Sequence, residues 1–244
     1  MVGYKVGKVP ESIAELNNNC KCYSAMAGKT GRTALMDSNA QYNGGLTAEQ
    51  FLFYEMRIVS KLYVQGKSIV EILEIVKSDN LFQYPTERQV SRLTRACYKR
   101  LIALDNECLV REIASQPVEA AKQINLYAMM RYNRLVRDFM INLVGEKYRL
   151  QDYSLTRKDT NVFFSRLMEQ NDDVAKWSEQ TITKLKQVLT KCLIETEMLD
   201  GVRDTKLNPI LISEELENGI RANNDLDALA AFNCFLKGCE HGRY

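Results

Sequence analysis

Three hydroxyl residues, each followed three positions later by Glu or Gln, stand before stretches with helical apolar spacing. These pairs are Thr47–Gln50, Ser68–Glu71 and Thr86–Gln89. In such a capping box, the hydroxyl and the later side chain satisfy free N–H groups at the start of a helix. Because all three pairs are in register with an apolar-periodic segment, they predict consecutive helices over residues 47–65, 68–78 and 86–104.

Similar patterns predict helix along most of the remaining chain. The further helices are expected over residues 106–115, 117–130, 132–145, 161–171, 178–199, 213–220 and 225–236. Residues 207–212 contain a proline and β-branched side chains, so we expect a short extended strand there. The fold class is therefore all-α with minor β. We expect a weakly patterned arm over 1–45, a helical domain with a helix-turn-helix over 46–150, and a second helical domain over 151–244.

The helix expected over 86–104 has two opposite faces. An α-helix turns about 100° per residue, so four basic side chains fall within an arc of roughly 60°. These are Arg88, Arg92, Arg95 and Lys99. The apolar side chains cluster on the opposite side of the wheel, at Val90, Leu93, Cys97, Leu101 and Leu104. The helix is thus expected to pack through one face and to expose a row of cations on the other.

Two interpretations of this row remain open, a solvated surface or a surface that binds a polyanion. The whole chain carries a net charge of only +2, but residues 86–104 hold five basic side chains and one acidic one. Like charges three or four residues apart on a helix repel each other by a few tenths of a kcal/mol per pair. Surfaces usually mix both signs, so we favour the anion-binding interpretation.

Nucleic acid is the large anion that this arrangement favours. A helix, a turn and the basic helix follow one another in helix-turn-helix order, although the turn is longer than in the simple motif. In that motif, the N-terminal residues of the second helix reach base edges. Here they are Thr86, Arg88, Gln89, Ser91 and Arg92. Arg95 and Lys99, further along, are expected at phosphates.

Two other groups are secondary candidates for DNA contact. Arg131 and Arg134 lie in the middle of the chain, and pairing with Asp138 or Glu146 is an equally good account of such cations. Thr183 and Lys186 lie on the polar side of the helix expected over 178–199. That helix is close to neutral, so we favour a structural role for it.

Other motifs in the chain fail their chemical requirements. AGKTGR at 27–32 resembles a phosphate loop, but the required earlier glycine is replaced by Tyr23. Cys20 and Cys22 have the wrong spacing for a zinc site, and His241 is the only histidine. A single histidine near the chain end also argues against histidine-dependent catalysis. We therefore expect no enzyme activity, no cofactor and no metal.

Several short features resemble a known family. They are Tyr23-Ser24-Ala25, Glu55, Gly66, the Asn80-Leu81-X-Gln83 turn, and the helix with Arg88, Arg92, Arg100 and Leu101. A looser likeness runs through WSEQTITKLKQVLTKCL to NPILISEEL, so most of residues 23–220 are covered. The chain resembles the BrxA family of the bacteriophage-exclusion (BREX) defence systems. It differs from that pattern in the long segment 27–43.

The resemblance implies an almost wholly helical protein with two small domains and winged-helix character. It also implies non-enzymatic binding of double-stranded DNA, which adds Arg100 to the candidate contacts on the basic helix. Other defence proteins are expected as partners, and a small-molecule substrate is not. Without an apolar leader or a membrane-length apolar stretch, and with seven scattered cysteines, we expect a cytoplasmic protein with reduced thiols. An interaction module and a transcription regulator remain alternative functions.

Overall fold

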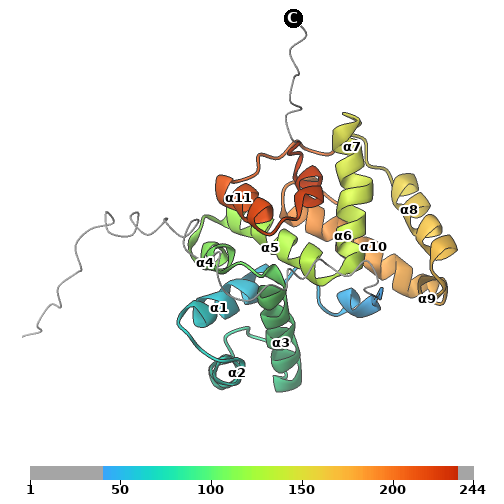
Figure 1. The fold of residues 1–244 in the computed structure, drawn as a ribbon. Coiled ribbons are helices and arrows are strands. Elements are labelled where there is room, and N and C mark those ends of the chain that lie inside the picture. The colour runs from blue at the N-terminus through green and yellow to red at the C-terminus, as the bar shows by residue number, and fades with distance from the viewer. Residues whose placement is uncertain (1–40, 236–244) are drawn as a thin grey trace, which may run out of the picture. The chain divides into compact units, whose positions relative to one another are not determined.

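The computed structural model describes residues 41–235, and these residues form an all-α fold (Figure 1). A short 3-10 helix, η2 (Gly44–Thr47), comes first. The helices that follow in the first half are α1 (Phe53–Val64), α2 (Ile69–Ser78), α3 (Glu87–Leu104), α4 (Glu107–Ser115) and α5 (Val118–Tyr132). The predicted fold class is thus confirmed, and for four of the helices predicted in this half both bounds lie within two residues of the observed ones.

The second half continues with shorter and less regular helices. In chain order they are α6 (Arg134–Phe139), the π-helical turn η3 (Met140–Gly145), α7 (Glu146–Arg149), α8 (Arg157–Gln170), α9 (Asp172–Ala175), α10 (Glu179–Glu195), α11 (Glu214–Ala222) and the 3-10 helix η4 (Leu226–Phe232). Side-chain caps start several of them. Thr156 and Asp159 form a complete capping box at α8, and Ser178 caps α10.

The capping prediction succeeded at two helices and failed at the first. Ser68 and Glu71 form the full capping box of α2, and Thr86 accepts a hydrogen bond from the backbone N–H of Gln89 at α3. Thr47 instead ends η2, and its hydroxyl donates to the carbonyl of Gly44. The prediction that a helix starts at residue 47 was therefore wrong, because α1 begins only after Leu52, which has a left-handed backbone.

Two other expectations are corrected. Residues 207–212 form no strand, and β pairing within residues 41–235 is limited to one isolated bridge between Ser154 and Lys206. The winged-helix character expected from the resemblance is accordingly not confirmed. The helix expected to end at Gly145 runs on into α7. A Cβ at Gly145 would lie 3.1 Å from Ala230, so this glycine permits η3 to pack closely against η4.

The core is built around α3 and α5. Helix α3 packs against α1, α2 and α5, and α5 also contacts α4 and α6. Buried apolar side chains from Leu46 to Phe232 belong to one cluster. Helix α10 joins it through a buried stripe of Ile182, Leu185, Val188, Leu189, Cys192 and Leu193. The proposed division at residue 150 stays a prediction.

Candidate nucleic-acid interface

Helix α3 has the two faces that its sequence predicts. Each residue of the expected apolar stripe is buried, namely Val90, Leu93, Cys97, Leu101 and Leu104. The four cations of the opposite face are exposed, and we call Arg88, Arg92, Arg95 and Lys99 the basic row. The apolar stripe therefore holds α3 against the core and fixes the direction in which the basic row points.

Among the described residues, no carboxylate forms an ion pair with the basic row. The one acidic residue of α3, Glu87, lies 3.2 Å from the ammonium of Lys77 on α2. Glu87 is thus engaged by a cation outside the row. An exposed row of like charges without compensating acids is a local positive surface of the kind that binds polyanions.

The other predicted DNA contacts on α3 have mixed surroundings. Thr86 is exposed, but its hydroxyl oxygen already accepts the hydrogen bond that caps α3. Gln89 and Ser91 are half-buried beside the basic row. Thr86, Gln89 and Ser91 therefore lie at the edge of the surface, and its charge comes from the four cations of the basic row.

Arg100 lies inside the protein and not on the basic row. Its side chain is 1% exposed, and its guanidinium donates to the backbone carbonyls of Glu49, Gln50 and Phe51. Asn125 of α5 donates to the same Phe51 carbonyl over 2.8 Å. Arg100 therefore anchors the segment before α1 onto α3, and its burial removes it from the candidate DNA contacts.

The connection between α2 and α3 is held firmly. Asn80 and Gln83 have positive φ angles of 41° and 57°, and the Gln83 N–H donates to the Asn80 carbonyl over 2.8 Å. Tyr84 donates its hydroxyl to the buried carboxylate of Glu55 over 2.6 Å. That hydrogen bond, together with burial, raises the pKa of Tyr84 to about 12. The Glu55, Asn80 and Gln83 positions quoted for the family resemblance thus set how the chain enters α3.

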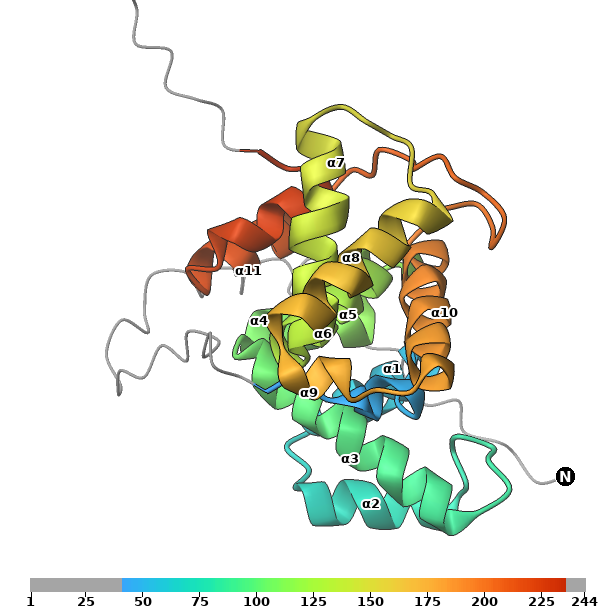
Figure 2. The same cartoon turned by 90° about the vertical axis from the view of Figure 1, so that its right-hand side faces the viewer.

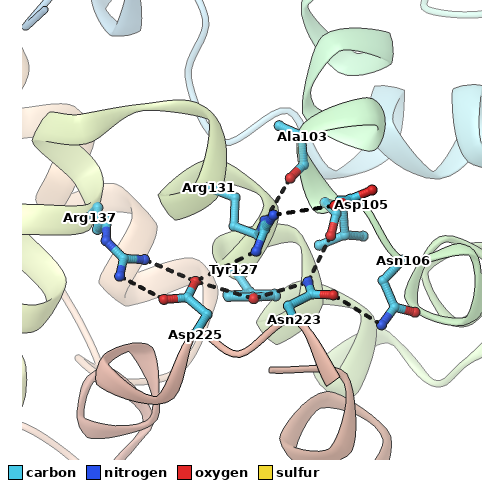
Figure 3. A network of polar contacts seen from close by, with 9 residues as sticks. Ala103, Asp105, Asn106, Tyr127, Arg131, Arg137, Asn223 and Asp225 are labelled. Carbon is cyan, nitrogen blue, oxygen red and sulfur yellow. Dashed lines mark hydrogen bonds and ion pairs between the residues drawn. The ribbon is translucent and has the colours of Figure 1, made fainter. Parts of the chain in front are cut away.

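The other end of α3 is fixed by a polar network, shown in Figure 3. Arg131 of α5 donates to the carbonyl of Ala103 over 2.7 Å and lies 3.9 Å from both Asp105 and Asp225. Arg137 of α6 makes two hydrogen bonds to Asp225, at 2.6 and 2.9 Å. We call Tyr127, Arg131, Arg137, Asn223 and Asp225 the Asp225 network.

This network decides the roles of the secondary candidates in the middle of the chain. The side chain of Arg131 is only 8% exposed and pairs with Asp105 and Asp225, so it does not extend the basic row. Arg134 forms an ion pair with Asp138 at 3.4 Å and lies over the ring of Tyr42. Of the two interpretations that the sequence left open for Arg134, ion pairing is the one that the structure shows, and Asp138 is the partner.

Thr183 and Lys186 lie on the exposed side of α10. Thr183 is exposed, whereas Lys186 is half-buried and donates to the side-chain oxygen of Asn161 on α8 over 2.7 Å. Its ammonium also lies 5.3 Å from the centre of the Phe164 ring. Both residues line a cleft between α8 and α10 that the sequence did not predict.

Metal and thiol chemistry have little support in the described part of the chain. No group of three or more His, Cys, Asp or Glu residues within 41–235 could hold a metal ion. Burial raises the pKa of the Cys97 and Cys192 thiols to about 12, so both stay protonated. None of the helices in this range is long and apolar enough to cross a membrane. The predictions for AGKTGR, Cys20, Cys22, His241 and most of the arm concern residues outside the described range.

Fold and surface together define a protein that is all-α over residues 41–235 and that presents, on α3, a row of exposed cations without an ion-pair partner among these residues. A family model described as BrxA matches residues 40–224. A BREX protein BrxA of Bacillus cereus (strain H3081.97) is 33% identical over 185 residues, which cover 75% of this chain and 92% of the relative. The chain therefore belongs to the BrxA family of the BREX systems, and the resemblance seen in the sequence is confirmed.

More distant relatives agree with this assignment. A BREX protein BrxA of Paramagnetospirillum magneticum (strain ATCC 700264 / AMB-1) is 21% identical over 171 residues, covering 70% of this chain and 85% of the relative. A crystal structure of an uncharacterized protein from Magnetospirillum magneticum matches with a TM-score of 0.67 at 20% identity. The match covers 78% of this chain and 97% of that chain. This likeness shows the fold alone.

Proposed function

We propose that this chain is a non-enzymatic accessory protein of an anti-phage BREX system in the cytoplasm, and that it binds double-stranded DNA through the basic row. One observation carries the proposal. Four exposed cations of α3 share one face, and no carboxylate of the described residues pairs with them. A duplex supplies a phosphate about every 1.7 Å along its axis, so a row of this kind can neutralise several of them.

The way in which α3 is held supports binding to the phosphate backbone. The hydrogen bond between Tyr84 and Glu55 fixes the start of α3, and the Asp225 network fixes its end. A rigid helix presents its charges without further loss of conformational freedom. The connection of eight residues between α2 and α3 is longer than in the simple helix-turn-helix. We therefore propose contacts with the phosphate backbone, which carry no sequence information, rather than contacts with particular bases.

The salt dependence of binding tests this function. Each phosphate contact contributes about −0.9 to the slope of log K against log salt concentration, so four contacts contribute about −3.6. Replacing Arg88, Arg92 and Arg95 with Ala removes three contacts. We expect weaker binding to a 30-base-pair duplex of mixed sequence and a slope flatter by about 2.7.

A matched control separates this site from general charge. Arg166, Lys176 and Lys206 are exposed cations outside α3, and their combined replacement by Ala removes the same charge. We expect the control to change the slope far less than the α3 variant does. Equal slopes for the wild type and the α3 variant would reject the basic row as the DNA site. An absence of duplex binding by the wild type would reject the function.

Membership of a BREX defence system favours a second candidate, an interaction module that binds another protein of that system. In this case the basic row docks an acidic surface of another defence protein. Capture of that partner from cells would be lost on replacing Arg88, Arg92 and Arg95, while duplex binding would persist. A transcription regulator, the third candidate, requires a preferred operator. Selection from random duplexes distinguishes it, because only a regulator returns a common motif.

A further inference from the structure

A second cationic surface lies away from the basic row, in a cleft lined by α8 and α10. Figure 2 shows the ribbons of these two helices. The cleft has a volume of about 860 Å³ and is open to solvent. Its walls come from the first turn of α8 and from the exposed side of α10. The hydrogen bond from Lys186 to Asn161 joins the two helices across it.

Four cations line this cleft, and we call Arg157, Lys184, Lys186 and Lys191 the cleft cations. Within residues 41–235 none of the four forms an ion pair. The one carboxylate among the described lining residues, Glu195, lies 3.1 Å from the ammonium of Lys122 on α5 and is thereby neutralised. The cleft therefore has a local charge of the same sign and size as the basic row.

The uncharged lining indicates which part of a nucleic acid the cleft fits. It offers hydroxyl and amide groups from Thr160, Asn161, Thr183, Gln187 and Thr190. The hydroxyls of Thr160 and Thr190 already donate to the carbonyls of Thr156 and Lys186. The Thr183 hydroxyl and the amide groups of Asn161 and Gln187 can donate hydrogen bonds to phosphate and sugar oxygens. Among the described residues of the lining there is no aromatic side chain, whereas surfaces that hold unpaired bases stack them on aromatic rings. The chemistry thus fits the phosphates of a duplex better than the bases of a single strand.

A smaller cleft connects this surface to α3. It has a volume of about 450 Å³ and shares Gln50, Lys191 and Glu195 with the larger cleft. Its opposite wall includes Tyr84 and Gln89 at the start of α3. On the helical wheel Gln89 lies about 60° from Arg92, so this wall adjoins one edge of the basic row. The two clefts therefore adjoin at these shared residues, between the start of α3 and the cleft cations.

We propose that the cleft between α8 and α10 is a second phosphate-binding surface, and that one DNA duplex contacts it together with the basic row. This inference rests on the proposed function and enlarges its site. The two surfaces come from different halves of the chain. The duplex then binds across both halves, past the smaller cleft that lies between the two surfaces.

The size of the salt slope distinguishes one surface from two. Four phosphate contacts give a slope of about −3.6, whereas eight contacts give about −7. We expect the wild-type protein to show the steeper value with a 30-base-pair duplex. A fluorescence anisotropy titration at several salt concentrations measures it.

Charge-removing variants assign the slope to its two sources. Arg157, Lys184 and Lys191 are exposed, so replacing all three with Gln leaves the core intact. Lys186 is kept because of its bond to Asn161. We expect the cleft variant to flatten the slope by about 2.7, as the α3 variant does, and to weaken binding roughly 100-fold at 0.15 M salt. The Arg166, Lys176 and Lys206 control, with Gln at each position, should stay close to the wild type.

The outcomes separate this inference from the function on which it rests. A wild-type slope near −3.6 that only the α3 variant flattens would overturn the cleft and leave the proposed function standing. Equal effects of the cleft variant and the control would also overturn it. A wild-type protein that binds no duplex would overturn both. Thermal unfolding of each variant confirms that the compared proteins are folded.

Discussion

The basic row and the Asp225 network use the same kind of residue in opposite ways. In the row, cations recur along one helix, face solvent and have no acidic partner among the described residues. In the network, Arg131 and Arg137 lie against the carboxylate of Asp225, which is only 9% exposed. A charge removed from water needs a partner, whereas an exposed charge does not. Burial, and not residue type, therefore separates the cations that stabilise the fold from those that are available to a ligand.

The largest effect is expected from breaking the network at its carboxylate. Replacing Asp225 with Asn leaves Arg131 and Arg137 without their shared counter-charge. We expect the free energy of unfolding to fall by about 3–5 kcal/mol, because loss of one partner strands a buried charge. Urea unfolding at neutral pH measures the change. DNA affinity of the folded fraction should stay close to that of the wild type.

An exposed pair provides the control for that substitution. Glu217 and Arg221 form an ion pair on the surface of α11, and Glu217→Gln should cost no more than about 0.5 kcal/mol. Similar losses for Asp225→Asn and Glu217→Gln would contradict the structural role of the network.

The second prediction contrasts two arginines of one helix. Arg100→Met removes the hydrogen bonds to the carbonyls of Glu49, Gln50 and Phe51, and we expect a loss of about 3 kcal/mol in the free energy of unfolding. Arg95→Met removes an exposed cation and should change it by less than about 0.5 kcal/mol. Only Arg95→Met should weaken duplex binding. The reverse pattern in either assay would show that the two arginines have been assigned the wrong roles.

The third prediction uses pH to test the network. Burial first, and the negative charge of Asp225 second, raise the pKa of Tyr127 to about 12. Because the folded state favours the neutral phenol, its stabilising effect is present below pH 10 and is lost as the pH rises from about 10 to 12. We expect tyrosinate absorbance at 295 nm to include a late component in this range.

Two variants assign that component. Tyr127→Phe should remove it, and Asp225→Asn should shift it to lower pH because one of the causes of the raised pKa is gone. A late component unchanged in Tyr127→Phe would mean that other tyrosines account for it, since Tyr42 and Tyr84 also have pKa values of about 12.

The smallest effect concerns the stability of the basic row itself. Replacing Arg88, Arg92 and Arg95 with Ala removes like-charge repulsion and introduces the best helix former. We expect the free energy of unfolding to rise by a few tenths of a kcal/mol. Chemical unfolding at low salt, where repulsion is least screened, measures it. A clear decrease in the free energy of unfolding would indicate that these arginines stabilise the fold. The basic row would then not differ in role from the arginines of the Asp225 network.

Local patterns predicted much of the fold. The apolar stripe of α3 and the caps at Ser68, Thr86 and Ser178 follow from hydrogen bonds and spacing within a few residues, and the structure confirms them. The box at Thr47 failed because a hydroxyl can equally serve a short 3-10 turn, as it does with Gly44. Residues 207–212 have strand-forming side chains but no adjacent strand to pair with among the described residues.

The candidate site was only partly predictable. The basic row needed nothing beyond the helical wheel. The burial of Arg100 depends on carbonyls about 50 residues earlier in the chain, and Arg137 meets Asp225 across 88 positions. The spacing of side chains along one helix carries no information about partners that lie so far away in the chain. The cleft cations could not be predicted from the sequence for the same reason. In the sequences of α8 and α10 they are interspersed with acidic residues, and only the packing of the two helices brings the cations to one surface.

The sequence by itself determined the helices and the direction of the basic row, because hydrogen bonds and side-chain spacing along one helix are local. Only the tertiary structure decided which cations remain available. A charge is free or engaged according to what the fold places beside it, and those neighbours come from segments far apart in the chain. Among five basic residues of α3, the fold buries Arg100 and leaves the other four facing solvent.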